Sequence, residues 1–475
     1  MDHVDLAIIG SGSGNSLITP DFDDKQVAVV ESGVFGGTCL NVGCIPTKMF
    51  VYAAEVAQTV RESGRYGVEA HLDGVDWPAI RDRVFGRIDP ISGGGLDYRR
   101  SGANTRVYQG RARFTGPREL AIRDAGGLET ALTADQIVIA AGSSAVVPEV
   151  IRDCGVPFHT SDTVMRLERL PSSVVIVGGG FIAAEFAHVF SALGARVSLI
   201  VRGPALLRVE DDAISAAFTA GAQRRWDVHL GVQPAQVAAH QDGVAVTLTS
   251  GEVVTGEVLL VATGRSPNTP DLNLAAAGVQ VHPDGRVVVD GHGRTGAPGV
   301  WALGDVSSPY QLKHVANHEA RVVAHNLAHP DELKSFDHRF VPSAVFTSPQ
   351  IASVGATERD LIEAGTPYVS KVQRYGDTAY GWAMEDTEGF CKLLADPRTG
   401  RLLGAHVLGA EASTLIQPAI QAMSLGATVQ QVARGQYWIH PALAEVLENA
   451  LLGLELTAAS EVLEMPVEGE GVSRP

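Results

Sequence analysis

Residues 4–16 read Val4-Asp5-Leu6-Ala7-Ile8-Ile9-Gly10-Ser11-Gly12-Ser13-Gly14-Asn15-Ser16. The apolar run predicts a buried strand, and the glycines after it predict a tight turn whose backbone N–H groups can approach a pyrophosphate. A second run, Val27-Ala28-Val29-Val30, ends at Glu31, where a carboxylate can accept hydrogen bonds from a ribose diol. The stretch therefore predicts a dinucleotide-binding unit. Asn15 replaces the third glycine of the usual fingerprint, so we expect looser helix–strand packing there.

The same pattern returns in the middle of the chain. Val174-Val175-Ile176-Val177 enters a glycine turn and a predicted helix through Leu193, and the next apolar run, Val197 to Val201, ends at Arg202. Arg202 and Arg208 can form charge-assisted hydrogen bonds with a 2′-phosphate, which favours NADPH over NADH. The alternative interpretation is that Arg202 and Arg208 are ordinary solvent-exposed residues of a loop, which would give the same sequence pattern. Two such units predict two nucleotides.

Half of the four cysteines lie five residues apart in Gly36-Gly37-Thr38-Cys39-Leu40-Asn41-Val42-Gly43-Cys44-Ile45-Pro46-Thr47-Lys48. Gly43 permits the tight turn that a disulfide between them needs, and Pro46 marks a first helical turn. Cys44 would then lie at the positive end of a helix, where the pKa of a thiol falls, with Lys48 one turn on. A structural disulfide or half a metal site would also use two cysteines, but no further ligands stand at metal-binding spacing. Cys154 and Cys391 stand alone and are expected to be small apolar residues.

Composition narrows the class of protein. The chain has 475 residues, 45% of them apolar, and a net charge of −17, which predicts about three globular domains and argues against nucleic acid or an anionic membrane as partner. We expect no signal peptide and no membrane span. Four cysteines in such a chain indicate the reducing cytoplasm, where a close pair is more often catalytic than structural.

The motifs predict an α/β fold with two Rossmann-like dinucleotide-binding domains and a C-terminal α+β domain. The strand Ile137-Val138-Ile139-Ala140-Ala141 closes the first domain at a glycine turn, and a similar strand, Leu259 to Ala262, closes an inserted one. A third strand ends at Gly304-Asp305, and beyond Arg339 short strands alternate with two helices. We therefore expect domain parts at 1–150, 151–270, 271–338 and 339–456, and a disordered tail at 457–475, which is rich in Glu, Gly, Ser and Pro.

The order of these motifs resembles that of the pyridine-nucleotide disulfide oxidoreductases over nearly the whole chain. The resemblance is carried by the first nucleotide unit, Gly-Gly-Thr-Cys-x4-Cys at 36–44, the second unit, Gly304-Asp305, and His440-Pro441-x3-Glu445. It implies a homodimeric FAD enzyme that uses a nicotinamide dinucleotide, here NADPH, to reduce a small disulfide. It implies no metal site.

The resemblance also assigns roles to individual residues. Cys44 would face the flavin, Cys39 would be the interchange thiol, and Lys48, paired with Glu185, would lie near the flavin's reactive nitrogen. His440, oriented by Glu445, would act as the acid on the dithiol of the partner subunit. FAD would be held by Gly10, Gly12, Gly14, Glu31, Thr38, Gly142, Asp305 and Val315. NADPH would be held by Gly178, Gly180, Ala183, Arg202, Arg208 and Gly264.

The sequence leaves the disulfide substrate open within the family. Arg202 and Arg208 argue against an NAD-linked dihydrolipoamide dehydrogenase, and the lack of a further cysteine pair near the C-terminus argues against a mercuric reductase. Glutathione reductase stays open. A redox-sensing flavoprotein without turnover is the alternative from another class, although such a sensor needs no acid at His440.

Overall fold

The computed structural model describes residues 2–241 and 243–457. The chain divides into two compact units, Met1–Ser348 and Pro349–Pro475, which are described separately. The tail predicted to be disordered lies outside the described residues except for Thr457, whose N–H and hydroxyl donate to Pro397 O.

The first sheet of the N-terminal unit has the strand order β3-β2-β1-β6-β5-β4, with β16 also pairing β6. Its strands are β1 (Asp2–Ile9), β2 (Val27–Glu31), β3 (Thr105–Gln109), β4 (Arg111–Gly116), β5 (Glu119–Arg123), β6 (Glu129–Ile139) and β16 (Val300–Ala302). The pairs β1–β2, β2–β3, β1–β6 and β6–β16 are parallel. Glycine turns and Asp305 therefore follow neighbouring parallel strands at one edge of the sheet, where nucleotides bind in such folds.

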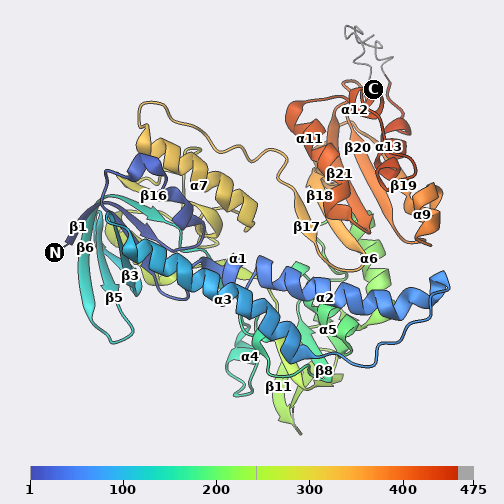
Figure 1. The fold of residues 1–475 in the computed structure, drawn as a ribbon, viewed down its shortest axis with the longest axis horizontal. Coiled ribbons are helices and arrows are strands. Elements are labelled where there is room, and N and C mark those ends of the chain that lie inside the picture. The colour runs from blue at the N-terminus through green and yellow to red at the C-terminus, as the bar shows by residue number, and fades with distance from the viewer. Residues whose placement is uncertain (1, 242, 458–475) are drawn as a thin grey trace, which may run out of the picture. The chain divides into compact units, whose positions relative to one another are not determined.

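Several helices belong to this part of the chain (Figure 1). They are α1 (Gly37–Asn41), α2 (Cys44–Glu62), α3 (Trp77–Ser101) and α7 (Lys313–Ala328), with the short 3-10 helices η1 (Ser13–Leu17), η2 (Pro20–Phe22), η3 (Ser63–Tyr66) and η7 (Gly304–Val306). Helices α3 and α7 lie beside the sheet, whereas α2 runs away from it toward the second parallel sheet (Figure 1). None of the helices in the described residues has the length and apolar content that crossing a membrane requires.

The turn after β1 differs from our expectation. The segment that follows is the short 3-10 helix η1, and the tight contact falls on Gly14, where a Cβ would lie 2.8 Å from both Ile8 Cγ2 and Ala140 Cβ. Asn15 is held by Arg99, whose Nε donates to Asn15 Oδ1 at 2.7 Å and whose Nη2 donates to Asn15 O at 3.0 Å. The packing is therefore tight one residue earlier than the fingerprint predicts.

The inserted domain has a parallel sheet of order β10-β9-β8-β14 and an antiparallel sheet of order β11-β12-β13. Its elements are β8 (Ser173–Val177), α5 (Phe181–Leu193), β9 (Arg196–Val201), α6 (Asp212–Arg225), β10 (Asp227–Leu230), β11 (Pro234–His240), β12 (Gly243–Leu248), β13 (Val253–Gly256) and β14 (Val258–Val261), after a short α4 (Glu149–Arg152) and η4 (Val164–Arg166). Two crossing segments, β7 (Ser143–Ala145) and β15 (Arg265–Pro267), pair antiparallel where the chain enters and leaves the domain. The short η5 (Pro270–Leu272) and η6 (Leu274–Ala277) follow β15, and β17 (Ser343–Val345) ends the unit.

The C-terminal unit contains an antiparallel sheet of order β18-β21-β20-β19. Its strands are β18 (Gln350–Gly355), β19 (Val369–Arg374), β20 (Phe390–Ala395) and β21 (Leu402–Gly409). Its helices are α8 (Glu358–Glu363), α9 (Ala379–Ala383), α10 (Ala412–Leu415), α11 (Gln417–Leu425), α12 (Val429–Arg434) and α13 (Ala444–Leu452), with η8 (Tyr375–Asp377). The expectation of two helices was wrong because these helices are short, and the boundaries of α8 and α12 are set by capping boxes at Thr357 and Thr428.

Candidate functional site

The cysteine pair spans the junction of α1 and α2. Cys39 lies in α1, and Cys44 is the first residue of α2, with Gly43 between the helices. A Cβ at Gly43 would lie 2.9 Å from Thr38 O and 3.2 Å from Cys39 Cα, so only glycine lets the start of α2 approach Cys39 this closely. Both cysteines are free thiols, with Cys39 half-buried and Cys44 exposed.

The two thiols have different acidities. A hydrogen bond from the Cys39 thiol, together with the charge of Lys48, lowers the pKa of Cys44 from 9.0 to about 7, although the protein atoms around its sulfur displace some water and oppose the shift. The same hydrogen bond, followed by burial, raises the pKa of Cys39 well above its ordinary value. Of the two thiols, Cys44 is therefore the one that ionises more readily.

Lys48 and Glu185 meet although they are 137 residues apart in the sequence. Lys48 Nζ donates to both Glu185 carboxylate oxygens at 2.7 Å, and Glu185 is 5% exposed on α5. Phe346 supports both groups, because its N–H donates to Glu185 Oε1 at 2.9 Å and its ring centroid lies 4.2 Å from Lys48 Nζ. The ammonium is thus fixed one turn along α2 from Cys44.

The predicted FAD residues line the carboxyl edge of the first sheet. Gly10 has φ +107°, and a Cβ there would lie 2.3 Å from Ala140 O, so the turn requires glycine. Glu31, at the end of β2, accepts hydrogen bonds from Ser11 N and Ser11 Oγ on one oxygen and from Gly33 N on the other. A carboxylate has about four acceptor positions, so room remains for a ribose hydroxyl.

Asp305 lies at the end of β16 and accepts a hydrogen bond from Ser143 Oγ at 2.6 Å. Arg265 Nε donates to the same Ser143 Oγ at 2.8 Å, and Arg265 Nη2 donates to Ser143 O. Gly142 and Gly264, both with positive φ, immediately precede this serine and arginine. The other residues predicted to bind FAD lie in separate elements. Gly12 belongs to the turn after β1, Thr38 lies in α1, and Val315 is buried in α7.

The chemistry of this edge suits a dinucleotide. A Cβ at Gly10 would clash with Ala140 O, so the turn requires glycine, and the Glu31 carboxylate lies partly exposed at the next strand end. The sequence did not predict the roles of Ser11, Ser143 and Arg265. Ser11 donates to Glu31, Ser143 donates to Asp305, and Arg265 donates to Ser143. Ser143 and Arg265 each follow a glycine that ends a predicted strand, and that signal could have identified them.

The second glycine turn repeats the first. Gly178 has φ +143°, and a Cβ there would lie 2.1 Å from Ala262 O, while the Cβ direction of Gly180 is open. Gly180 is the N-cap of α5, and Ala183 is buried in the first turn of that helix. Arg202 follows β9 and is exposed. Arg208 Cδ lies 2.8 Å from the Cβ position of Gly203, so the two arginines gather at one strand end.

His440 and Glu445 form a pair of their own in the C-terminal unit. His440 Nδ1 lies 2.7 Å from Glu445 Oε1, and Glu445 Oε2 accepts a hydrogen bond from Ala442 N at 3.1 Å. The hydrogen bond with His440 is the main cause that lowers the pKa of the Glu445 carboxyl. The imidazole is 73% exposed and therefore open to solvent.

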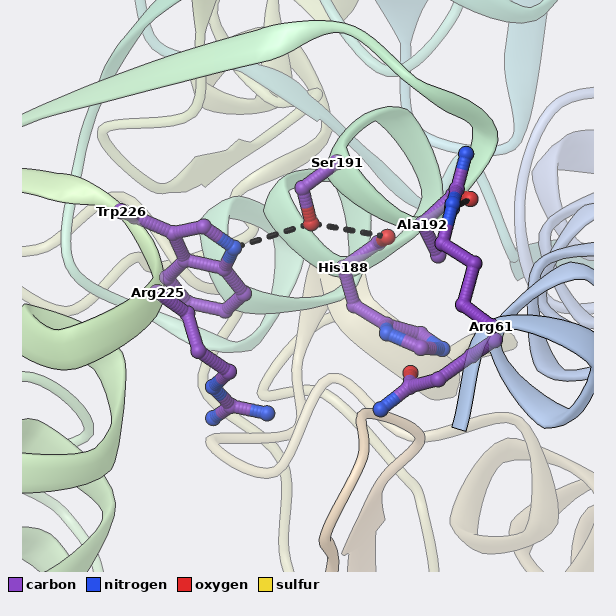
Figure 2. Close-up of a pocket in the computed structure, with 7 residues that line it drawn as sticks. Arg61, His188, Ser191, Ala192, Arg225 and Trp226 are labelled. Carbon is purple, nitrogen blue, oxygen red and sulfur yellow. Dashed lines mark hydrogen bonds between the residues drawn. The ribbon is translucent and has the colours of Figure 1, made fainter. Parts of the chain in front are cut away.

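A cavity of about 220 Å³ lies where α2, α5 and α6 end (Figure 2). It is lined by Gln58, Arg61, His188, Ser191, Ala192, Arg225 and Trp226. Arg61 donates to Ala192 O and Arg225 donates to Gly221 O and Ser348 O, so both arginines cap carbonyl groups near the helix ends. Burial, with the charge of Arg225, lowers the pKa of His188 to about 4. We interpret this cavity as a junction between the helices that carry Lys48 and Glu185.

Comparisons with known proteins place these features in one family. Residues 4–320 match the family model "Pyridine nucleotide-disulphide oxidoreductase", and residues 341–451 match the dimerisation domain of that family. The mycothione reductase of Mycobacterium tuberculosis is 57% identical over 463 residues, which are 96% of this chain and all of that protein. A mercuric reductase of Streptomyces lividans is 36% identical, covering 94% of this chain and 95% of that one.

A solved structure has the same architecture. The HOCl-induced flavoprotein disulfide reductase RclA of Escherichia coli superposes with a TM-score of 0.83 at 27% identity, over 94% of this chain and 99% of that chain.

Proposed function

The chain belongs to the pyridine nucleotide-disulphide oxidoreductase family, and from this premise we propose that it reduces mycothione, the disulfide of mycothiol, with electrons from NADPH. The observation that supports the substrate is the 57% identity to a mycothione reductase, over 96% of this chain and all of that protein. The nicotinamide preference is supported by the arginines at the end of β9. Family membership makes the protein an enzyme that depends on FAD and a nicotinamide dinucleotide, and its dimerisation domain makes it a homodimer.

We propose the following division of the chain. Residues 1–150 and 271–338 bind FAD, 151–270 bind NADPH, and 339–456 form the dimer interface. We also propose a cytoplasmic location, because a reductase of this kind works against a reducing thiol pool.

The strand ends at Gly10, Glu31 and Asp305 would hold FAD, which would supply the electron pair that opens the Cys39–Cys44 disulfide to two thiols. The chain's own residues then perform the exchange. Cys44 keeps the thiolate because its pKa is the lower of the pair, and Lys48, held by Glu185, balances negative charge beside it. The Cys39 thiol gives its proton to His440 of the partner subunit as its sulfur attacks one sulfur of the substrate, which forms a mixed disulfide and releases one substrate thiolate. Cys44 then attacks Cys39, which restores the disulfide and releases the second thiolate.

The released thiolates need protons. We propose that His440 of the partner subunit supplies them, with Glu445 holding its Nδ1 so that Nε2 faces the dithiol. This role is supported by the exposed ring and the fixed carboxylate, and it makes the dimer necessary for turnover.

A direct assay tests the substrate. Steady NADPH oxidation should be fastest with mycothione when it is compared at equal concentrations with glutathione disulfide and lipoamide. A higher kcat/KM for glutathione disulfide would replace the proposed substrate by the alternative, glutathione reductase. No disulfide-dependent NADPH oxidation with any of the three would favour a redox sensor.

Arg202→Glu should shift the nucleotide preference from NADPH toward NADH. A charge-assisted hydrogen bond to a 2′-phosphate contributes about 1.5–3 kcal/mol, so the ratio of kcat/KM for NADPH over NADH should fall roughly 10- to 100-fold. Arg196→Glu is the matched control, because Arg196 is an exposed arginine at the opposite end of the same strand. An unchanged ratio for Arg202→Glu would remove Arg202 from the phosphate site.

A further inference from the structure

Lys313 places a positive charge at the N-terminus of a helix, where acidic side chains are usually preferred. It is the first residue of α7, and the first turn of that helix contains no acidic side chain and no side-chain cap. The N-terminus of a helix carries partial positive charge, so a cation there is unfavourable. Residues that break local rules in this way are often found at functional sites. The ammonium adds its charge to that of the helix end.

The polar group that contacts the Lys313 ammonium is an uncharged hydroxyl, so it does not balance the positive charge. Its Nζ lies 2.9 Å from Ser13 Oγ, and the Ser13 hydroxyl donates to Asn317 Oδ1 at 3.2 Å. Within residues 2–241 and 243–457, Lys313 forms no ion pair with a carboxylate. Its hydrogen bond therefore fixes the position of the ammonium without cancelling its charge.

Backbone contacts bring this charge close to the cysteine pair. Ser13 follows Gly12, and a Cβ at Gly37 would lie 2.6 Å from Gly12 Cα, so the turn after β1 and the start of α1 touch. Cys39 stands two residues further along α1. The charge of Lys313 opposes the rise in the pKa of Cys39 that the hydrogen bond to Cys44 and burial produce. Arg99 of α3 also contacts this turn, and its guanidinium donates hydrogen bonds to Asn15.

We propose that Lys313 is the electrostatic partner of Cys39, stabilising the negative charge on its sulfur while it exchanges with the substrate disulfide. The two thiols then have separate cations: Lys48 serves Cys44, and Lys313 serves Cys39. The inference rests on the proposed role of Cys39 as the exchanging thiol. It adds a residue that the glycine, cysteine and histidine motifs do not include.

The test measures the acidity of Cys39 in the FAD-bound dimer, without turnover. In a Cys44→Ser background, the rate of Cys39 alkylation by iodoacetamide is followed against pH by peptide mass spectrometry, which separates Cys39 from Cys154 and Cys391. Lys313→Met should raise the midpoint by about one pH unit, which is a tenfold loss of thiolate below the midpoint. Lys313→Arg should restore the original midpoint.

Lys25→Met is the matched control. It also removes one lysine charge, but Lys25 precedes β2 at the opposite edge of the sheet, and its midpoint should equal the parent's. If Lys313→Met loses FAD, Lys313→Gln replaces it, since an amide can keep the bond to Ser13 without the charge. An unchanged midpoint in the flavin-loaded Lys313 variant overturns the proposal. Failure to reduce mycothione would instead refute the proposed substrate and leave this measurement unaffected.

Discussion

Cys39→Ser should abolish disulfide reduction while NADPH still reduces the flavin. Without the exchanging sulfur no mixed disulfide can form, so we expect turnover to fall about 10⁴-fold or more, as when other enzymes lose a nucleophile. Cys39 is half-buried and serine is nearly isosteric, so the fold should persist. Rapid-mixing measurements of flavin bleaching by NADPH, beside steady-state turnover, separate the two half-reactions.

The same variant reports on Cys44. A thiolate beside oxidised flavin gives a long-wavelength absorption, and the remaining Cys44 should produce it. The thiolate exists above its pKa, so the band should grow as pH rises and fade as pH falls. The midpoint should lie below the 9.0 of a free thiol, because Lys48 remains and the serine hydroxyl can still donate a hydrogen bond. Cys44→Ser is the control and should show no band. A band in Cys44→Ser, and none in Cys39→Ser, would exchange the roles of the two cysteines.

His440→Gln should slow turnover about 10²- to 10⁴-fold, which is the usual contribution of a positioned acid or base. Glutamine can donate a hydrogen bond but cannot supply a proton at neutral pH. Flavin reduction by NADPH should be unchanged, because His440 acts only on the exchange step. The exposed ring supports few packing contacts, so the melting temperature should stay close to that of the parent.

Two further variants test whether the loss is specific to the role of His440. Glu445→Gln keeps the imidazole but removes the carboxylate that orients it, so we expect a smaller loss of about tenfold. His282→Gln makes the same replacement at an exposed histidine outside the proposed site and should leave turnover unchanged. Equal turnover in His440→Gln and the parent would show that the acid is another group.

Much of the candidate site could be predicted because its signals are local. The strand at β1, the turn at Gly10 and the carboxylate at Glu31 are encoded in consecutive residues, and their backbone requirements appear directly in residue type. The pairing of Lys48 with Glu185 came from the family resemblance and not from spacing. The structure adds the physical reason for its stability, which is that Phe346 supports both side chains.

Short elements and shared contacts could not be predicted in this way. Most helices of the C-terminal unit were not predicted because they span fewer than seven residues, which is too short for a periodic apolar pattern to appear in the sequence. The close packing at Gly14 was not predicted. The sequence fingerprint expects the third glycine at position 15, whereas the need for glycine at position 14 arises from the nearby side chains of Ile8 and Ala140.

The two nucleotide units, the close cysteine pair and the candidate acid could be predicted because each is a run of neighbouring residues with a typical chemical use. Which charged groups meet depends on how the chain packs in three dimensions. Ser143 and Asp305 are 162 residues apart, and Ser13 and Lys313 are 300 apart, yet each pair is in hydrogen-bond contact. Electrostatic effects depend on distance in space, and that distance is set by how sheets and helices pack, so the acidity of Cys39 and Cys44 belongs to the folded chain alone.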